Sequence, residues 1–427
     1  MALEKFGTRE YAGGVVHAPF VRAGKWVFGT GLRATLPDGR LDPDVVRSTR
    51  PLGVPPQSQR EAAAIFATMA HHLHLAGSSL ERVARLDQYY PDPRAVDPYH
   101  VARKNVLAGR VSPSTSIIVN RLLNLDAAMD LQVLAATDAS GYQLRQAAAG
   151  SGLHVPATSG YAPHLRVGDL VFIAGQLARD ASGQLAAEAQ VPAGQQWNGT
   201  GIQLETDYLV QHRLVPALTD AGSRLGLVLK AQVYLSQPDD LPAFWLSWSK
   251  AFGGRVPPTT VVPVRHPAFG TSAATVEINV VAAHESAADA VRDIDCDVEL
   301  IAGDMIPARA FDGLLFVAGL MGIADGGICP SAQVDPSAPF YQDSAAAQMA
   351  DALRKATKIF AAAGSDLSQV TRALHFHGDL RDFRNCHLAW DPALRAEGIP
   401  FTAVEVAQQM FAPGARVVLD LWGHVPE

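Results

Sequence analysis

Three acidic residues lie inside strand-like apolar segments, where a carboxylate is least expected. Asp130 lies in AAMDLQVLAA, Glu277 in TVEINVVAAH and Asp420 in VVLDLWGHV. An isolated ionised carboxylate in an apolar core costs several kcal/mol, so each acid should face a polar cleft or an ionic partner. A carboxylate in a cleft can orient water and exchange a proton with a substrate. We therefore predict that these acids are catalytic residues, with a structural salt bridge to a neighbouring copy as the alternative for Glu277.

Arginines recur near the strand-like segment that opens each third of the chain. Arg22 lies in PFVRAGKW and Arg166 in PHLRVGDL, and Arg309 follows the same pattern with one residue inserted. A guanidinium matches a carboxylate with two parallel hydrogen bonds. Arg22 and Arg166 are therefore predicted to bind an anionic group of a substrate. The alternative is an exposed arginine whose aliphatic stem covers apolar surface.

The last third of the chain holds a dense polar cluster. His375 and His377 are two residues apart on a predicted strand and share a face, and Asn385, Cys386 and His387 follow. These residue types suit zinc, but their spacing matches no defined zinc motif, so a metal at the histidine pair stays an open alternative. We predict no metal or other cofactor and assign an acid–base role to His387. A surface strand edge with a helix residue nearby is the structural alternative.

The segments that carry these residues repeat three times. Glycines end strand-like runs in KWVFGTGLRA, LVFIAGQLAR and LLFVAGLMGI at a spacing of 144 residues: Gly31, Gly175 and Gly319. A second set, in HLAGSSL, DAGSRLG and AAGSDLS, is spaced by 145 and 142 residues: Gly77, Gly222 and Gly364. The acids in apolar strands form a third marker in the same order. The agreement predicts three copies of one unit, over 1–140, 141–290 and 291–427.

Each copy has the same predicted order of elements, β-β-α-β-α-β-β. Runs rich in Val, Phe, Ile and Leu open each copy and read as strands. Apolar residues spaced by three and four then predict long helices over 60–77, 205–222 and 344–364, each ending at a glycine suited to a helix C-terminus. A strand, a second helix, a proline-marked turn and two strands complete the copy.

Composition excludes several classes of protein. The 427 residues are 48% hydrophobic and 18% charged, a globular balance, and the net charge is −7. Without a concentrated cationic face, a general nucleic-acid binder is not expected. No apolar run reaches the roughly 18 residues of a membrane span, and the N-terminus has no signal-like apolar region. Three cysteines without CxxC spacing argue against a disulfide framework, so we expect a soluble cytoplasmic protein.

Several motifs together resemble the RidA/YjgF/UK114 family. They are the opening PFVRAGKW or PHLRVGDL, the AGQL strand, the AGS-x-L helix end, the Pro-x-x-T turn and the closing VEI strand. Single-copy members of this family form trimers of small chorismate-mutase-like α+β units. The resemblance implies that this chain builds such a trimer internally, as a pseudo-trimeric monomer with sheets inside and helices outside. Its further oligomeric state is left open.

The resemblance also implies candidate site residues, because the family's deaminase site pairs a glutamate with an arginine in a cleft between units. The glutamate position corresponds to Glu277, and to Asp130 and Asp420 in the other copies. The arginine position holds Ser114, Pro258 and Phe401, so the usual arginine is missing. Neighbouring family positions place four substrate-binding candidates in the clefts, two from the first copy and two from the second: Arg103, Ser116, His164 and Thr260.

Two functions from different classes follow. The first is a hydrolytic enzyme acting on a C–N bond of a small molecule, of the enamine or imine deaminase or amidohydrolase type, with acid-oriented water and an Arg or His holding an anion. The second is a non-catalytic pseudo-trimer that binds a small metabolite, which loss of the family arginine favours. Hydrolases with Ser–Lys pairs are disfavoured because no lysine recurs at one position of the copies. RNA cleavage is the least favoured reading, given the net negative charge.

Overall fold

The computed structural model describes residues 3–11, 13–47, 55–108, 110–148, 153, 155, 159–195, 200–324, 327–337, 342–407 and 409–426. Its strands form three large mixed sheets, one for each third of the chain. The first runs β1 (Glu4–Phe6), β4 (Phe20–Ala23), β5 (Trp26–Leu32), β9 (Asp130–Ala136), β6 (Val83–Tyr90) and β7 (Ser114–Ile118). The second runs β10 (Leu144–Gln146), β11 (His164–Val167), β12 (Leu170–Gln176), β15 (Val276–Ala283), β13 (Val228–Leu235) and β14 (Thr259–Pro263). The third runs β16 (Arg292–Ile294), β17 (Ala308–Phe311), β18 (Leu314–Val317), β23 (Val417–His424), β21 (Val370–His377), β22 (Phe401–Glu405) and β8 (Arg121–Leu122).

The predicted order of elements is confirmed in all three thirds, which we call the first, second and third units after their sheets. In the second unit the chain runs β11, β12, a long helix, β13, a second helix, β14 and β15. Each sheet contains one parallel pair, β6–β7, β13–β14 or β21–β22, and the remaining neighbours in these three sheets are antiparallel. The parallel pairs follow from the helix that crosses over between their strands. One strand changes sheets: β8, from the first third of the chain, pairs with β22.

The helices also lie where the sequence pattern predicts them. The long ones are α2 (Gln57–Leu75), α4 (Gly201–Leu209) continuing into α5 (Val215–Asp220), and α7 (Ser344–Ala362). The shorter ones are α3 (Val96–Val106), α6 (Leu241–Ala251), and the pair α8 (Phe383–Leu388) and α9 (Pro392–Glu397). Gly77, Gly222 and Gly364 follow the long helices with φ values of 74°, 74° and 81°, the left-handed conformation expected at a helix end. Small elements complete the fold: α1 (Pro43–Val46), β2 (Arg9–Tyr11), β3 (Val15–His17), β19 (Ile323–Ala324) and β20 (Gly327–Ile328).

The long helix of the second unit has a local feature that the apolar pattern did not predict. Residues Val210–Leu214 form a π-helical turn between α4 and α5. Pro216, which has no amide hydrogen, lies just after this turn. A proline inside a helix removes one backbone hydrogen bond and crowds the carbonyl four residues before it. The wider π turn lies where the helix must accommodate that proline.

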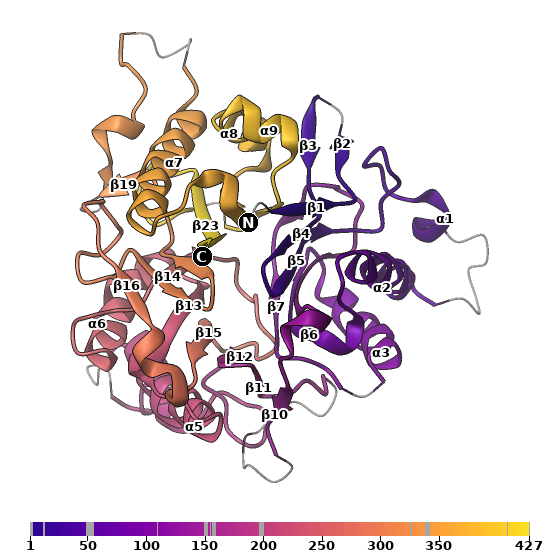
Figure 1. Ribbon diagram of the computed structural model, residues 1–427. Coiled ribbons are helices and arrows are strands. Elements are labelled where there is room, and N and C mark those ends of the chain that lie inside the picture. The colour runs from indigo at the N-terminus through magenta and orange to yellow at the C-terminus, as the bar shows by residue number, and fades with distance from the viewer. Residues whose placement is uncertain are drawn as a thin grey trace.

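The three sheets meet in the middle of the molecule, and the helices lie on their outer sides (Figure 1). Residues at equivalent positions of β6, β13 and β21 contact one another there. The hydroxyls of Tyr89 and Tyr234 are 2.9 Å apart, and both rings make edge contacts with Phe376. Because both faces of each sheet are covered, the central strands are buried along their whole length. Among the described residues, none of the helices has the length and apolar character that a membrane crossing requires.

Candidate active site

The cross-strand register shows which acids are equivalent. Asp130 lies opposite Tyr89 and Glu277 lies opposite Tyr234, but the third unit has Val418 opposite Phe376. Asp420 lies two residues farther along, opposite Leu374. The prediction that Asp420 occupies the position of Glu277 is therefore wrong. A shift of two residues keeps the same side of a strand facing the same way, so apolar alternation alone could not detect it.

A smaller shift affects the strand that faces these acids. Ser114 pairs with Leu86, and its equivalents, judged by the same pairing, are Thr259 and Phe401. The predicted counterpart Pro258 is one residue too early. Thr260 is therefore equivalent to Thr115 and Thr402, and it is Val261 that matches Ser116. A one-residue slip moves a side chain to the other face of a strand, so the site assignment of Thr260 changes with it.

Three boundaries between units result, and each brings a strand of one unit against the opening strand of the next. We call the boundary of the first and second units the first cleft, that of the second and third units the second cleft, and that of the third and first units the third cleft. Gly175, Gly319 and Gly31 lie at equivalent points of these boundaries. A Cβ at each would collide with, or crowd, the facing unit or the site: Glu277 and Thr115 for Gly175, Thr260 for Gly319, and the Phe401 carbonyl for Gly31. The recurring glycines are required by this close approach of the units.

The first cleft contains a cavity of about 320 Å³. Glu277 on β15 lines it, 6% exposed, with its carboxyl group above Gly175 in space that any side chain there would occupy. Ser114 and Ser116 on β7 form the facing wall. Ser116 donates a hydrogen bond to Gln88 Oε1 at 2.8 Å. The structure therefore brings two of the predicted site residues, Glu277 and Ser116, to one cavity.

Arg179 and Tyr161 complete the polar wall of the first cleft, and the sequence analysis missed both. Arg179 Nη2 donates to the hydroxyl of Tyr161 at 2.9 Å, and both residues line the cavity with Glu277. Tyr161 lies three residues before His164, which had been chosen for this role. Its equivalents are marked by isolated bridges to the preceding unit: Val111 with Tyr161, Val256 with Met305, and Ile399 with His17. Only one of these positions is a tyrosine, so repetition within the chain gave no signal for it.

Arg103 lies behind the cavity wall instead of in the cavity. It is fully buried on α3 and donates to Ser114 Oγ at 3.0 Å and to the carbonyl of Ser159 at 2.6 Å. Its guanidinium also lies 5.3 Å from the centre of the Tyr99 ring. Trp248, at the matching position of α6, makes the matching contact to Thr259 Oγ1 at 3.2 Å. Arg103 therefore positions Ser114 and ties the first unit to the second, and it is not among the residues that line the cavity.

Burial shifts the pKa values of two groups that line the first cleft in opposite directions. It raises the pKa of Glu277 to about 8; the charge of Asp87 adds to this rise, and Arg179 and Arg85 oppose it. Burial, with the nearby charges of Arg103 and Lys104, lowers the pKa of His100 to about 3. At neutral pH the cleft therefore holds a protonated carboxyl group and a neutral imidazole. Opposed shifts of this kind mark acid–base sites.

The raised pKa of Glu277 should appear in the stability of the protein. The unfolded carboxyl group ionises near pH 4.5 and the folded one near pH 8, so the folded state holds more protons in this window. We expect the free energy of unfolding to fall as pH rises from 4.5 to 8. Glu277→Gln should remove that part of the slope and be more stable than the natural protein at pH 8 by about 2–4 kcal/mol. Urea unfolding of both proteins at pH 5 and pH 8 measures this, and parallel pH dependences would contradict it.

The second cleft contains a buried ionic cluster. Asp420 lies 2.8 Å from Lys230 Nζ and 3.0 Å from Arg372, and it accepts a hydrogen bond from Thr260 Oγ1 at 3.1 Å. Although burial opposes ionisation, the two cations hold the pKa of Asp420 below its ordinary value. Lys230 also donates to Thr260 at 2.7 Å and to the carbonyl of Val317. Asp420 and Thr260 are thus buried structural residues, which corrects their predicted site roles.

The lysine at this boundary belongs to a recurring position that the sequence analysis overlooked. Arg85, Lys230 and Arg372 occupy equivalent points of their strands, each just after a register shift. Arg85 donates to the carbonyl of Ile173 in the second unit at 3.0 Å, as Lys230 does to Val317 in the third. A positively charged side chain therefore recurs at this position in all three units, although it is a lysine in only one of them. In the first two units this side chain links its unit to the next.

The third cleft is almost completely filled. Arg33 Nη1 lies 2.5 Å from Asp130, and both side chains are fully buried. Tyr11 and His17, from the additional strands β2 and β3 of the first unit, cover this pair and leave a cavity of about 10 Å³. Such a space holds about one water molecule. Asp130 is therefore an ion-paired residue of a closed cleft, with its pKa raised to about 6 because burial outweighs the effect of Arg33.

The remaining predicted residues lie away from the first cleft. Arg22 binds Glu4 at 2.7 Å and Arg166 binds Asp169 at 2.8 Å, each near the end of the long helix of its unit. His164 lies between sheet and helix, with Nε2 2.6 Å from Asp220. Each of these side chains binds a carboxylate of its own unit, and none of them lines the first-cleft cavity. The structure therefore does not bring Arg22, Arg166 or His164 to the position expected for binding a substrate anion.

The histidines of the third unit are interior residues. His375, His377 and His387 are each at most 1% exposed, and burial lowers the pKa of His387 to about 4. They pack against the aromatic rings of Phe383 and Phe401. In the described part of the chain, no group of three His, Cys, Asp or Glu side chains has the arrangement of a metal site. His387 is not among the residues that line the first-cleft cavity, and its acid–base role stays a prediction.

Comparison with known proteins identifies a family for this chain. A family model described as Endoribonuclease L-PSP matches residues 153–284 and 306–420. A search of curated proteins found no match to the chain. Among solved structures, YEO7 of yeast is 20% identical over 34% of this chain and 100% of its own, with a TM-score of 0.28. The Rid-family protein YyfA of Yersinia pestis is 15% identical over 33% and 99%, with a TM-score of 0.27. A putative endoribonuclease of Thermotoga maritima is 22% identical over 33% and 98%, with a TM-score of 0.25.

Proposed function

Since the chain belongs to the Endoribonuclease L-PSP family, the RidA/YjgF family that its motifs resemble, we propose that it is a hydrolytic enzyme acting on a C–N bond of a small molecule. The proposed site is the first cleft. The observation that carries the proposal is Glu277, a buried carboxyl group that lines an open cavity and makes no ion pair with any residue that the structure describes. Asp130 and Asp420, in contrast, are both ion-paired.

In this proposal the chain acts as an internal pseudo-trimer with units over 1–140, 141–290 and 291–427, and only one of its three clefts is used for catalysis. A homotrimer must keep three identical sites, whereas linked copies can diverge separately. The first cleft keeps an acid and a cavity of about 320 Å³, and the third keeps an acid but almost no space. The second has lost the acid at the equivalent position, where Val418 stands.

Glu277 supplies the first proton in the proposed reaction. The pair of electrons of an enamine C=C bond takes the proton from the protonated Glu277 carboxyl, which gives an iminium and leaves Glu277 as a carboxylate. That carboxylate then accepts a proton from water while the water oxygen bonds to the iminium carbon and the C=N electron pair moves to nitrogen. Collapse of the resulting carbinolamine releases ammonia and a carbonyl product. A carboxyl group whose pKa lies near the working pH can perform both transfers.

Arg179 is the proposed anion-binding residue. It is 7% exposed and lines the cavity with Glu277, and its Nη2 is oriented by the hydroxyl of Tyr161. The other guanidinium donors are available to a carboxylate of the substrate. In this proposal Arg179 takes over the role of the family arginine, whose position holds Ser114 in this chain. Arg179 reaches the cavity from the second unit, whereas Ser114 lies on the facing strand of the first unit.

The test is release of ammonia from a panel of small enamines and imines that carry a carboxylate. We expect turnover whose kcat/KM falls above about pH 8, because the Glu277 proton that starts the reaction is then lost. Arg179→Met should raise KM by about 10–100-fold, the worth of a hydrogen bond to a charged group, with a smaller change in kcat. Arg224→Met, on an exposed arginine of the same unit, should leave KM unchanged. Binding of these compounds without turnover would favour the non-catalytic alternative.

A further inference from the structure

The second cleft keeps a cavity of its own outside the ionic cluster. It has a volume of about 450 Å³ and lies between α6 of the second unit and the segments after β18 and β22 of the third. Its position matches that of the first-cleft cavity residue by residue. Five lining residues occupy places equivalent to lining residues of the first cleft: Pro238 for Pro93, Leu241 for Val96, Trp245 for His100, Ile323 for Arg179 and Phe411 for Phe269.

These equivalences rest on matching elements. Val96 and Leu241 begin α3 and α6, and the short turns before them start at Pro93 and Pro238. Phe269 and Phe411 each follow the first residue of their strand, β14 or β22, by ten positions. Arg179 and Ile323 lie four residues after the boundary glycines Gly175 and Gly319. The two cavities are therefore versions of one site in two pairs of units.

Four polar side chains of the first cleft have apolar equivalents in the second. Ile323 stands in place of the guanidinium of Arg179, and Trp245 in place of the imidazole of His100. Met305 and Val418 occupy the positions of Tyr161 and Glu277 in the chain register. The second cleft thus has none of the proposed catalytic groups, yet its cavity is the larger of the two.

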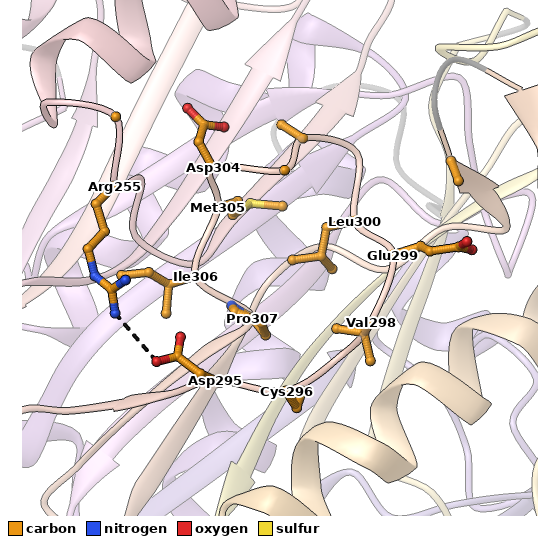
Figure 2. Close-up of a pocket in the computed structure, with 14 residues that line it drawn as sticks. Arg255, Asp295, Cys296, Val298, Glu299, Leu300, Asp304, Met305, Ile306 and Pro307 are labelled. Carbon is orange, nitrogen blue, oxygen red and sulfur yellow. Dashed lines mark ion pairs between the residues drawn. The ribbon is translucent and has the colours of Figure 1, made fainter.

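The apolar wall is held open by fixed contacts. The indole nitrogen of Trp245 donates to Asp304 at 2.9 Å, and Ser249 donates to the same carboxylate. Asp304 belongs to the loop 295–307, which carries Ile301 and Ala302 into the cavity. Figure 2 shows this loop around a neighbouring cavity, lined in contrast by Arg255, Asp295 and Glu299. Leu246, 66% exposed, continues the apolar surface at the rim.

Charge selects among ligands. Asp239 is the one charged residue among those that line the cavity, and Asp240 follows it in the chain. The Asp239 carboxylate repels an anion, and an apolar wall offers an anion no hydrogen bonds. We propose that the second cleft is a binding site for a small, apolar, ring-bearing ligand that is neutral or cationic, distinct from the anionic substrate of the first cleft. The flat side chains of Trp245 and Phe411 in the cavity wall are suited to contact with a ring.

The test uses N-phenyl-1-naphthylamine, a neutral apolar fluorophore, with the full chain. We expect saturable binding to one site, with fluorescence enhancement, and at least tenfold weaker binding of the anionic anilinonaphthalene sulfonate. Ile323→Arg, which restores the first-cleft residue, should weaken binding of the neutral probe at least tenfold, and Phe411→Ala should do so several-fold. Leu388→Arg, an exposed apolar position of the same unit outside the cavity, should leave binding unchanged.

Because Ile323 is 3% exposed, circular dichroism must show that the Ile323→Arg protein is folded. If that protein does not fold, Phe411→Ala provides the test instead. Unchanged affinity in the folded Ile323→Arg or Phe411→Ala protein would overturn the proposal, as would the absence of saturable binding or equal affinity for the anionic probe. Glu277→Gln should bind the probe normally. Loss of turnover and loss of probe binding therefore report on separate sites, and either proposal can fail alone.

Discussion

Replacing Glu277 with glutamine is expected to lower kcat/KM for C–N hydrolysis by about 10²–10⁴-fold, the usual contribution of a positioned acid–base group. Glutamine has nearly the same shape and fits above Gly175, but it cannot give up or take a proton. The variant should therefore keep its fold and lose the fall in rate above about pH 8 in whatever activity remains. Steady-state ammonia release across pH 6–9 measures both effects.

Asp130→Asn is the matched control, because Asp130 occupies the equivalent register position in the third cleft. Its partner there is Arg33, and almost no space remains for a substrate. We expect this variant to turn over substrate at the natural rate per folded molecule while being less stable. Equal losses of rate in the two variants would move the reaction away from the first cleft. Retained turnover in Glu277→Gln would exclude the proposed proton transfer.

Replacing Asp420 with asparagine is expected to destabilise the protein by about 3–5 kcal/mol, because it leaves buried charges without their counter-ion. Lys230 is 2% exposed and Arg372 is 7% exposed, and Asp420 is the carboxylate that contacts both. The cost should appear as a lower midpoint in urea with little change in m-value. The destabilisation caused by Asp420→Asn should be smaller when it is introduced into the Lys230→Met protein, because one of the two cations is then absent.

The control for this second prediction is Asp379→Asn, which removes a carboxylate that binds Arg381 near the surface of the same unit. An exposed ion pair contributes little because solvent screens it, so the midpoint should hardly move. Similar effects of the two substitutions would show that the ionic cluster of the second cleft does not hold the units together. Turnover in the first cleft should be unaffected by either change in the folded protein.

The repeated architecture was determined by the sequence itself. Glycines at constant spacing, apolar strands and amphipathic helices are local signals, and each predicted element is present, including the three helices that end at Gly77, Gly222 and Gly364. The acids in apolar strands were identified correctly as residues that need a partner or a cleft, because the cost of burying a carboxylate depends only on its surroundings being apolar. Glu277 and Ser116, both predicted as site residues, line one cavity.

Only the tertiary structure decided which of the three clefts has an acid lining an open cavity, and which other residues line that cavity. Strand alternation has a period of two, so it could not separate Asp420 from Val418 at the equivalent position. Arg179 and Tyr161 come from segments of the second unit that share no repeated signal, and they meet because one precedes β11 and the other follows β12, its antiparallel partner. The buried ion pairs of the other two clefts join residues 97 and 190 positions apart in the chain, Arg33 with Asp130 and Lys230 with Asp420. Such contacts depend on the packing of the units, which local sequence patterns do not encode.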